Sequence, residues 1–128
     1  MATPRQQEPA RDETPALIAA DKVEGTSVKN RQGESLGSID TVTIDKVSGK
    51  VAYAVMSFGG FLGIGDRYHP LPWSVLPYDP QESAYVVDID KTVLEKAPRL
   101  ARDENAQMQD RGWGERVYRY YDAPPYWI

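Results

Sequence analysis

Short apolar runs alternate with turn-forming residues between Ala16 and Pro98, at intervals of about ten residues. This rhythm is typical of a small all-β sandwich or barrel. The stretch "GTSVKNRQGESLGSI" predicts two strands joined by a turn over Asn30–Gly33. "KVAYAVMSF" is apolar at both odd and even positions, which predicts a central strand covered on both faces. "ESAYVVDID" predicts the last strand of the sheet.

Three features indicate where this sheet departs from regular strands. Ile39 is followed by Val42 and Ile44, and the change of parity predicts a bulge or a sharp bend. Prolines interrupt the extended segment "RYHPLPWSVLPYD", so we expect it at a sheet edge or a bulge. Gly33 and Gly49 lie in turn segments and are expected to be structural glycines, because glycine adopts positive φ at little cost.

The glycine-rich stretch "FGGFLGIGD" suits either a phosphate-binding loop or a bend in the sheet. It lacks the third glycine of a dinucleotide fingerprint and the lysine and hydroxyl pair of a P-loop. We therefore interpret it as a barrel corner, where glycine permits a tight kink. Its structural glycines are Gly59, Gly60, Gly63 and Gly65. Phe61, Leu62 and Ile64, between them, are expected to plug the barrel, and the alternative is an exposed protein contact.

Composition divides the chain into three parts. Residues 1–15 are polar and contain prolines, so they bury too little surface to order themselves and predict a flexible tail. Residues 16–98 carry the strand pattern and predict one barrel domain. Near its end, residues 91–97 predict a short helix whose Val93, Leu94 and Ala97 would close one end of the barrel. Residues 99–128 predict a partly helical C-terminal arm, called the arm below.

Aromatic residues concentrate in the arm, in the stretch "RGWGERVYRYYDAPPYWI". Trp113, Val117, Tyr120 and Tyr121 share one face of a helix if Gly114 begins it. Together with Tyr126 and Trp127 they are candidate protein-contact residues, because tryptophan, tyrosine and arginine are the residue types that anchor interfaces. Two alternatives stay open. The arm folds back on its own barrel, or it packs on a second subunit by exchange of arms.

Composition also excludes several classes of site. The chain of 128 residues has no cysteine and one histidine, which excludes a disulfide and any thiolate or multi-histidine metal site within one chain. Its net charge of −4, without a basic run, argues against nucleic acid as a partner. The sequence has no window of about twenty apolar residues, so we expect no direct insertion into a membrane. We therefore expect a cytoplasmic protein without a cofactor.

The titratable residues that remain give weak signals. Asp66 precedes His69 by three residues and could orient the imidazole, but no serine, cysteine or second base completes a triad. Asp88 and Asp90 share one face of a strand, where paired carboxylates could hold a hard cation, although such residues more often face water. We therefore expect neither a catalytic nor a metal site.

Three stretches together resemble the PRC-barrel domain family: "VKNRQGESLGSIDTVTID", "GKVAYAVMSFGGFLGIGDRYHPLPWSVL" and "VVDIDKTVLEKAP". The resemblance covers residues Leu17 to Pro98 and implies a strongly bent barrel of about six strands. The family is named for the cytoplasmic part of the photosynthetic reaction-centre H subunit. It is also found in a ribosome-maturation factor, where the barrel docks on a ribosomal protein. This chain looks most like the short stand-alone members.

The resemblance implies a non-catalytic adaptor that contacts other macromolecules. We expect the chain to bind an unidentified protein and to form a homodimer. One alternative is a peripheral partner of a membrane photosynthetic or electron-transfer complex, at its cytoplasmic face. A factor in ribosome or RNA assembly is another, and the last is a small-ligand enzyme that uses Asp66 and His69.

Overall fold

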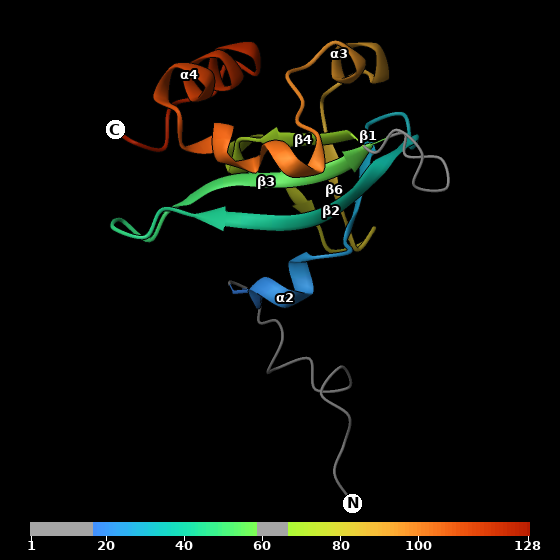
Figure 1. Cartoon of the computed structure of the whole chain (residues 1–128). Coiled ribbons are helices and arrows are strands. Elements are labelled where there is room, and N and C mark those ends of the chain that lie inside the picture. The colour runs from blue at the N-terminus through green and yellow to red at the C-terminus, as the bar shows by residue number, and fades with distance from the viewer. Residues whose placement is uncertain (1–16, 59–66) are drawn as a thin grey trace, which may run out of the picture.

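A computed structural model of the chain describes residues 17–58 and 67–128, and its centre is a six-stranded sheet (Figure 1). The strands are β1 (Ser27–Asn30), β2 (Ser35–Ile44), β3 (Val51–Phe58), β4 (Arg67–Leu71), β5 (Tyr78–Asp79) and β6 (Ala84–Val87). Their order is β4-β3-β2-β1-β6-β5; β1 and β6 pair in parallel and the other pairs are antiparallel. The predicted six-stranded all-β fold is confirmed. Within the described residues β4 and β5 do not pair, so the bent sheet stays open.

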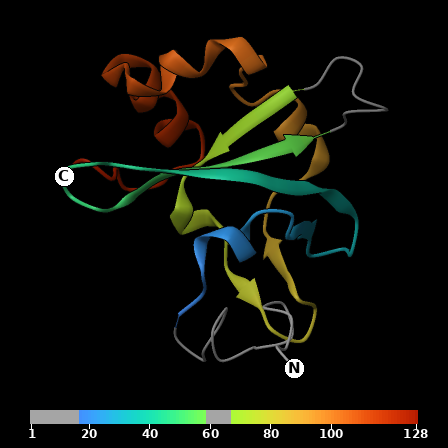
Figure 2. The ribbon, with the colours of Figure 1, turned by 60° about the horizontal axis from the view of Figure 1, so that its bottom comes forward.

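Short helices flank the sheet on both sides. They are α2 (Ala20–Val23), the 3-10 helices η2 (Trp73–Val75) and η3 (Arg102–Gln109), α3 (Lys91–Glu95) and α4 (Arg111–Tyr120). Figures 1 and 2 show α4 and η3 on one side of β3 and β4, and α2 on the opposite side of the sheet. The sequence pattern did not predict α2, a single turn whose one buried residue is Val23.

Strand β3 is buried on both faces, as the sequence predicts. Ala54 and Met56 belong to the core inside the bend of the sheet, together with Val28, Ile39 and other apolar residues. Tyr53 and Val55 belong to a second apolar cluster on the outer face. Because side chains alternate along a strand, β3 is the wall that separates the two clusters.

The predicted bulge in β2 is confirmed. The register between β2 and β3 shifts between Ile39 and Thr41, and again between Thr43 and Ile44. A bulge bends a strand and increases its twist, which suits a strongly curved sheet.

The proline-containing segment lies at a sheet edge, as predicted, but it is not one strand. β4 pairs with β3 alone among the strands, and the segment then passes through η2 into the short β5. Pro70, Pro72 and Pro77 lack the N–H that a continuous ladder needs, which explains the interruption. Leu100 covers part of the β4 edge, because it exchanges backbone hydrogen bonds of 3.1 and 2.8 Å with Tyr68.

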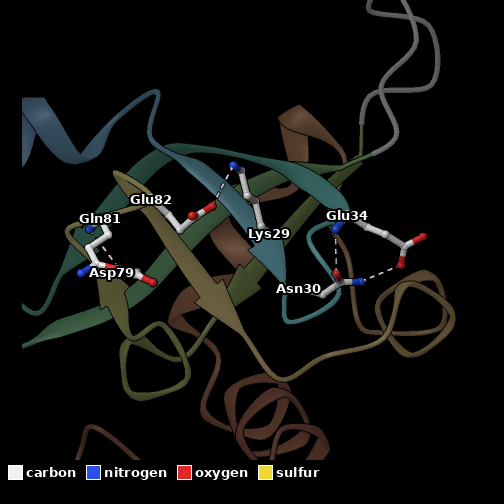
Figure 3. Close-up of polar contacts among 6 residues, drawn as sticks. All are labelled: Lys29, Asn30, Glu34, Asp79, Gln81 and Glu82. Atoms are coloured by element: carbon white, nitrogen blue, oxygen red, sulfur yellow. Dashed lines mark hydrogen bonds and ion pairs between the residues drawn. The ribbon is translucent and has the colours of Figure 1, made fainter.

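The turn between β1 and β2 is closed by Asn30 (Figure 3). The side-chain oxygen of Asn30 accepts from the backbone N–H groups of Gln32 and Glu34, at 3.1 and 2.9 Å, and its amide donates to the Glu34 carboxylate at 2.7 Å. Gly33 has a φ of +86°, a conformation that glycine adopts at little cost. The ion pair of 3.4 Å between Lys29 and Glu82 links β1 to the β5–β6 turn beside it.

The turn between β2 and β3 is equally well bonded. The Asp45 carboxylate accepts from the backbone N–H groups of Val47 and Ser48, at 2.9 and 3.3 Å, and these bonds lower the pKa of Asp45. Gly49 in this turn has a φ of +78°. This turn therefore holds a defined shape at the end of a projecting hairpin (Figure 1).

The predicted helix near residues 91–97 is present as α3, but one of its expected core residues is wrong. Leu94 and Ala97 are buried in the inner core, whereas Val93 is 42% exposed. The helix ends at Glu95, so the four-residue spacing of a longer helix does not bring Val93 and Ala97 to one face.

We predict that Gly37→Ala destabilises the fold far more than Gly33→Ala. A Cβ on Gly37 would lie 2.0 Å from the backbone oxygen of Ser57, whereas Gly33 has open space around it. The expected loss is roughly 3 kcal/mol for Gly37→Ala, because backbone must move, against roughly 1 kcal/mol for the positive φ of Gly33. Urea denaturation measures both, and equal losses would contradict this packing.

Candidate functional site

The arm forms a helix that begins earlier than the sequence predicts. Helix α4 starts at Arg111 rather than at Gly114, because the Asp110 carboxylate accepts from the backbone N–H of Trp113 at 2.8 Å and caps the helix. The buried residues of α4 are Trp113, Gly114, Val117 and Tyr118. Tyr118, which the sequence analysis did not place on the shared helix face, is buried, whereas Tyr120, which it placed there, is 39% exposed.

Tyr53 of β3 is the centre of the contact between the arm and the sheet. Its ring meets Trp113, Tyr118 and Tyr126 edge-to-face, with centroid distances of 5.8, 5.7 and 5.9 Å. Such pairs contribute roughly 0.5–1.5 kcal/mol each beyond the area they bury. The aromatic part of the arm thus packs around one tyrosine of the sheet.

Two polar contacts hold the arm on the sheet, and a cation–π contact lies within the arm itself. The Tyr118 hydroxyl donates to the carbonyl of Ala52 at the start of β3. Lys50 donates to the backbone oxygen of Ile128 at 3.1 Å. The Arg111 guanidinium lies 4.7 Å from the centroid of the Trp127 ring, a cation–π distance. The contacts with Lys50 and Ala52 set the register of the arm along the hairpin.

The hydroxyls in this contact are kept in their neutral form. Burial raises the pKa of Tyr53, Tyr118 and Tyr121, and neighbouring tyrosines raise each further. Within the described part of the chain, the hydroxyls of Tyr53 and Tyr121 are buried without a hydrogen-bond partner. An unsatisfied buried hydroxyl costs about 1–3 kcal/mol. The contact between the arm and the sheet is therefore less stable than its aromatic pairs alone would make it.

A groove of about 490 Å³ remains where the arm meets the β2–β3 hairpin. Ile44 of β2, Met108 of η3 and Tyr126 of the arm are among its lining residues. The arm therefore covers the outer face of the sheet but leaves this groove unfilled.

The candidate protein-contact residues fall into three groups. Trp113 and Val117 are buried against the chain's own sheet, and Tyr121, Tyr126 and Trp127 are half-buried there. Tyr120 is more exposed, and its hydroxyl donates to the carbonyl of Val93. Contact with another protein stays a prediction for all of them. The apolar residues Phe61, Leu62 and Ile64 and the glycines Gly59, Gly60, Gly63 and Gly65 lie outside the described residues.

Of the described residues considered for chemistry, the structure buries the histidine and leaves two carboxylates exposed. His69 is 0% exposed in β4, with its ring edge-to-face on Phe58 at 5.4 Å, and Asp66 lies outside the described residues. Asp88 and Asp90 are exposed. Across residues 17–58 and 67–128, no three histidine or carboxylate side chains gather in a group that could hold a metal ion.

Tyr53 is the central residue that the sequence analysis did not single out. Its position in a two-sided apolar strand predicted burial, but the pattern does not say which segment covers it. The signal that could have pointed to it is the aromatic excess of the arm, which needs an apolar face of similar size in its own chain or in a partner.

Comparison with known proteins identifies one family. Residues 15–94 match the model of the PRC-barrel domain, which is more than half of the chain. No curated protein matches the sequence. A solved structure, described as a proposed 16S ribosomal RNA processing protein, RimM, from Pseudomonas aeruginosa, shares 23% sequence identity and a TM-score of 0.40. That match covers 70% of this chain and 50% of the other, so the chain spans about half the length of that protein.

A membrane-spanning helix is also absent from the part of the chain that the structure describes, because none of its helices has the length and apolarity to cross a bilayer.

We predict opposite effects for two alanine substitutions in α4. Gly112→Ala should stabilise the docked arm by up to about 1 kcal/mol, because alanine favours a helix, and its Cβ meets only Asp110, at 3.4 Å. Gly114→Ala gains the same helix propensity, but its Cβ would lie 2.8 Å from the Tyr53 hydroxyl. Three aromatic rings prevent Tyr53 from moving aside. Hydrogen exchange of residues 111–120 should therefore slow in Gly112→Ala and accelerate in Gly114→Ala.

Equal protection of α4 in both variants would contradict the close approach of Gly114 to Tyr53.

Proposed function

The chain belongs to the PRC-barrel domain family, and from this membership we propose that it is a non-catalytic adaptor that acts through protein–protein contacts and forms a homodimer. An adaptor needs a surface that accepts a segment of another protein. An enzyme needs reactive groups that a substrate can reach. The burial of His69 supports the adaptor over the alternative enzyme that would use this residue.

The outer face of β3 and β4 is the observation that carries the proposal. Tyr53, Val55 and Tyr68 form an apolar face on the sheet, and the aromatic helix α4 lies on it. The segment that matches the family ends at residue 94, whereas α4 begins at Arg111. The barrel face therefore binds a helix from outside the family domain, which is the kind of contact an adaptor makes.

Residues of the arm that stay accessible are the proposed contacts with a further protein. Tyr120, Tyr126 and Trp127 keep part of their surface in solvent, and Arg116 and Arg119 are exposed beside them in the sequence. Tyrosine, tryptophan and arginine are enriched among the residues that dominate binding energy. A partner that covers this part of the arm would bury them without unfolding the contact to β3.

A peptide experiment tests whether the sheet face accepts a helix from another molecule. We predict that a peptide of residues 110–128 binds the full-length Gly114→Ala protein, whose own arm is displaced, and not the wild-type protein. Fluorescence anisotropy of a labelled peptide measures binding. The matched control is the same peptide with Gly114→Ala, which should bind at least about tenfold more weakly because it carries the collision itself.

If α4 exchanges fast in the Gly114→Ala protein and the wild-type peptide still does not bind, the claim that the sheet face accepts a helix from another molecule is wrong.

The homodimer is tested by absolute mass. Light scattering over a range of protein concentrations should approach twice the 14.3 kDa of one chain. A mass of 14.3 kDa at every concentration would overturn this part of the proposal.

A further inference from the structure

The turn between β2 and β3 lies beside the last residues of the arm at one end of the molecule (Figures 1 and 2). The contact is direct, because the Lys50 ammonium group donates to the backbone oxygen of Ile128 at 3.1 Å. The backbone N–H of Val47 lowers the pKa of Asp45 most, and the charge of Arg111 lowers it further, which places Arg111 close to the turn. Two segments that are far apart in the sequence therefore form one surface.

This surface exposes apolar side chains that the fold does not bury. Val47 is 97% exposed in the turn, Ile128 is 85% exposed, and Ile44 is 52% exposed where β2 ends. They are three of the six exposed large apolar residues in the described part of the chain. Single exposed apolar residues are ordinary in folded proteins, but three at one end of a small protein indicate a contact surface.

The turn presents Val47 in a fixed position. The Asp45 carboxylate accepts from the N–H groups of Val47 and Ser48, and the Asp45 backbone bonds to Gly49 and to Lys50 at 2.8 Å each. An apolar residue held outward by a bonded turn loses little conformational freedom when another surface covers it. The turn is therefore preorganised for a contact.

Charge indicates what covers this surface. Lys46 and Lys50 flank Val47 and are exposed, and Lys46 forms no ion pair with any residue that the structure describes. The carboxylate of Asp45 is turned onto the backbone of the turn, and residues 123–128 carry no charged side chain. The surface is therefore basic, although the whole chain has a net charge of −4. The two lysines and the three exposed apolar residues are called the hairpin surface below.

An anionic phospholipid membrane fits the hairpin surface better than a second copy of the chain. Lipid phosphates attract lysine side chains without a defined geometry, and an apolar residue between the lysines can reach the boundary of headgroups and acyl chains. Tyr126 and Trp127, which are half-buried next to Ile128 in the sequence, are residue types that concentrate at this depth. A second copy related by two-fold symmetry would instead set lysines against lysines, which repel.

From these observations we infer that the hairpin surface binds the surface of an anionic phospholipid membrane, with Val47 among the headgroups and Lys46 and Lys50 on the lipid phosphates. This binding is peripheral and needs no segment that spans the bilayer. The inference goes beyond the proposed adaptor function and does not depend on the homodimer. It also leaves the arm on β3 and β4 of its own chain, because the hairpin surface is separate from that contact.

Co-sedimentation of the full-length protein with vesicles tests the inference. We predict binding at low salt to vesicles of phosphatidylserine and phosphatidylcholine in equal amounts. Binding should be lost on phosphatidylcholine alone, and in about 0.5 M salt, which screens the lysines. Val47→Ser should weaken binding to the anionic vesicles by about tenfold, because the apolar contact is lost. Val93→Ser is the matched control, because Val93 is an exposed valine on α3, and it should leave binding unchanged.

A second pair of variants tests the charge. Lys46→Gln should weaken binding by about fivefold, because one lysine near the anionic surface is lost. Lys91→Gln makes the same change at an exposed lysine of α3 and should have no effect. Thermal unfolding by circular dichroism should stay cooperative in every variant, since all four side chains are exposed.

The outcomes separate this inference from the proposed function. A wild-type protein that does not sediment with the anionic vesicles overturns the inference and leaves the adaptor. Binding that is unchanged in both Val47→Ser and Lys46→Gln overturns the hairpin surface as the contact, and equal binding to neutral vesicles overturns the role of the lysines. If Val47→Ser instead lowers the molar mass in light scattering and leaves vesicle binding unchanged, a second copy covers this surface and the inference is wrong.

Discussion

The burial of Tyr53 and Val55 on the outer face of β3 is the constraint on which the rest of the molecule depends. A strand that is apolar on both faces stays out of water only if each face has a cover. The bend of the sheet covers the inner face with the core around Met56, but it cannot also cover the outer one. The arm supplies the second cover, and the molecule therefore has an aromatic layer in addition to the core of the barrel.

This division explains how a small family domain comes to have an outer apolar face that the arm covers. The bent sheet and every buried residue of its inner core except Ala97 lie within the segment that matches the PRC-barrel model. The arm lies outside that segment and binds the sheet through ring edges, a few polar contacts and the absence of a side chain at Gly114. The unsatisfied hydroxyls of Tyr53 and Tyr121 reduce the stability of this contact. A cover of this kind protects the face, and in the proposed function a similar helix from another molecule replaces it.

Local patterns in the sequence predicted the elements, and tertiary contacts decided what the patterns could not. The two-sided apolar strand, the parity change after Ile39 and the turn at Gly33 each depend on neighbours in the chain, and all three are present. The start of α4 was wrong because Asp110 caps the helix ahead of Gly114. The burial of Tyr118 depends on its contact with Ala52, which is distant in sequence, so the pattern within the arm did not predict it. No pattern within the arm identifies Tyr53 as its partner.

The contact between Tyr53 and Trp113 within one chain is the central claim, and an isotope-filtered NMR experiment tests it most directly. Labelled and unlabelled protein would be mixed, unfolded together and refolded, so that arms could exchange between molecules. The account predicts cross-relaxation between the Tyr53 and Trp113 rings, 5.8 Å apart, in fully labelled protein, and none between labelled and unlabelled molecules. Signals between the two kinds of molecule would show that the arm covers a second subunit instead, and no signal in either sample would show that the arm does not lie on β3.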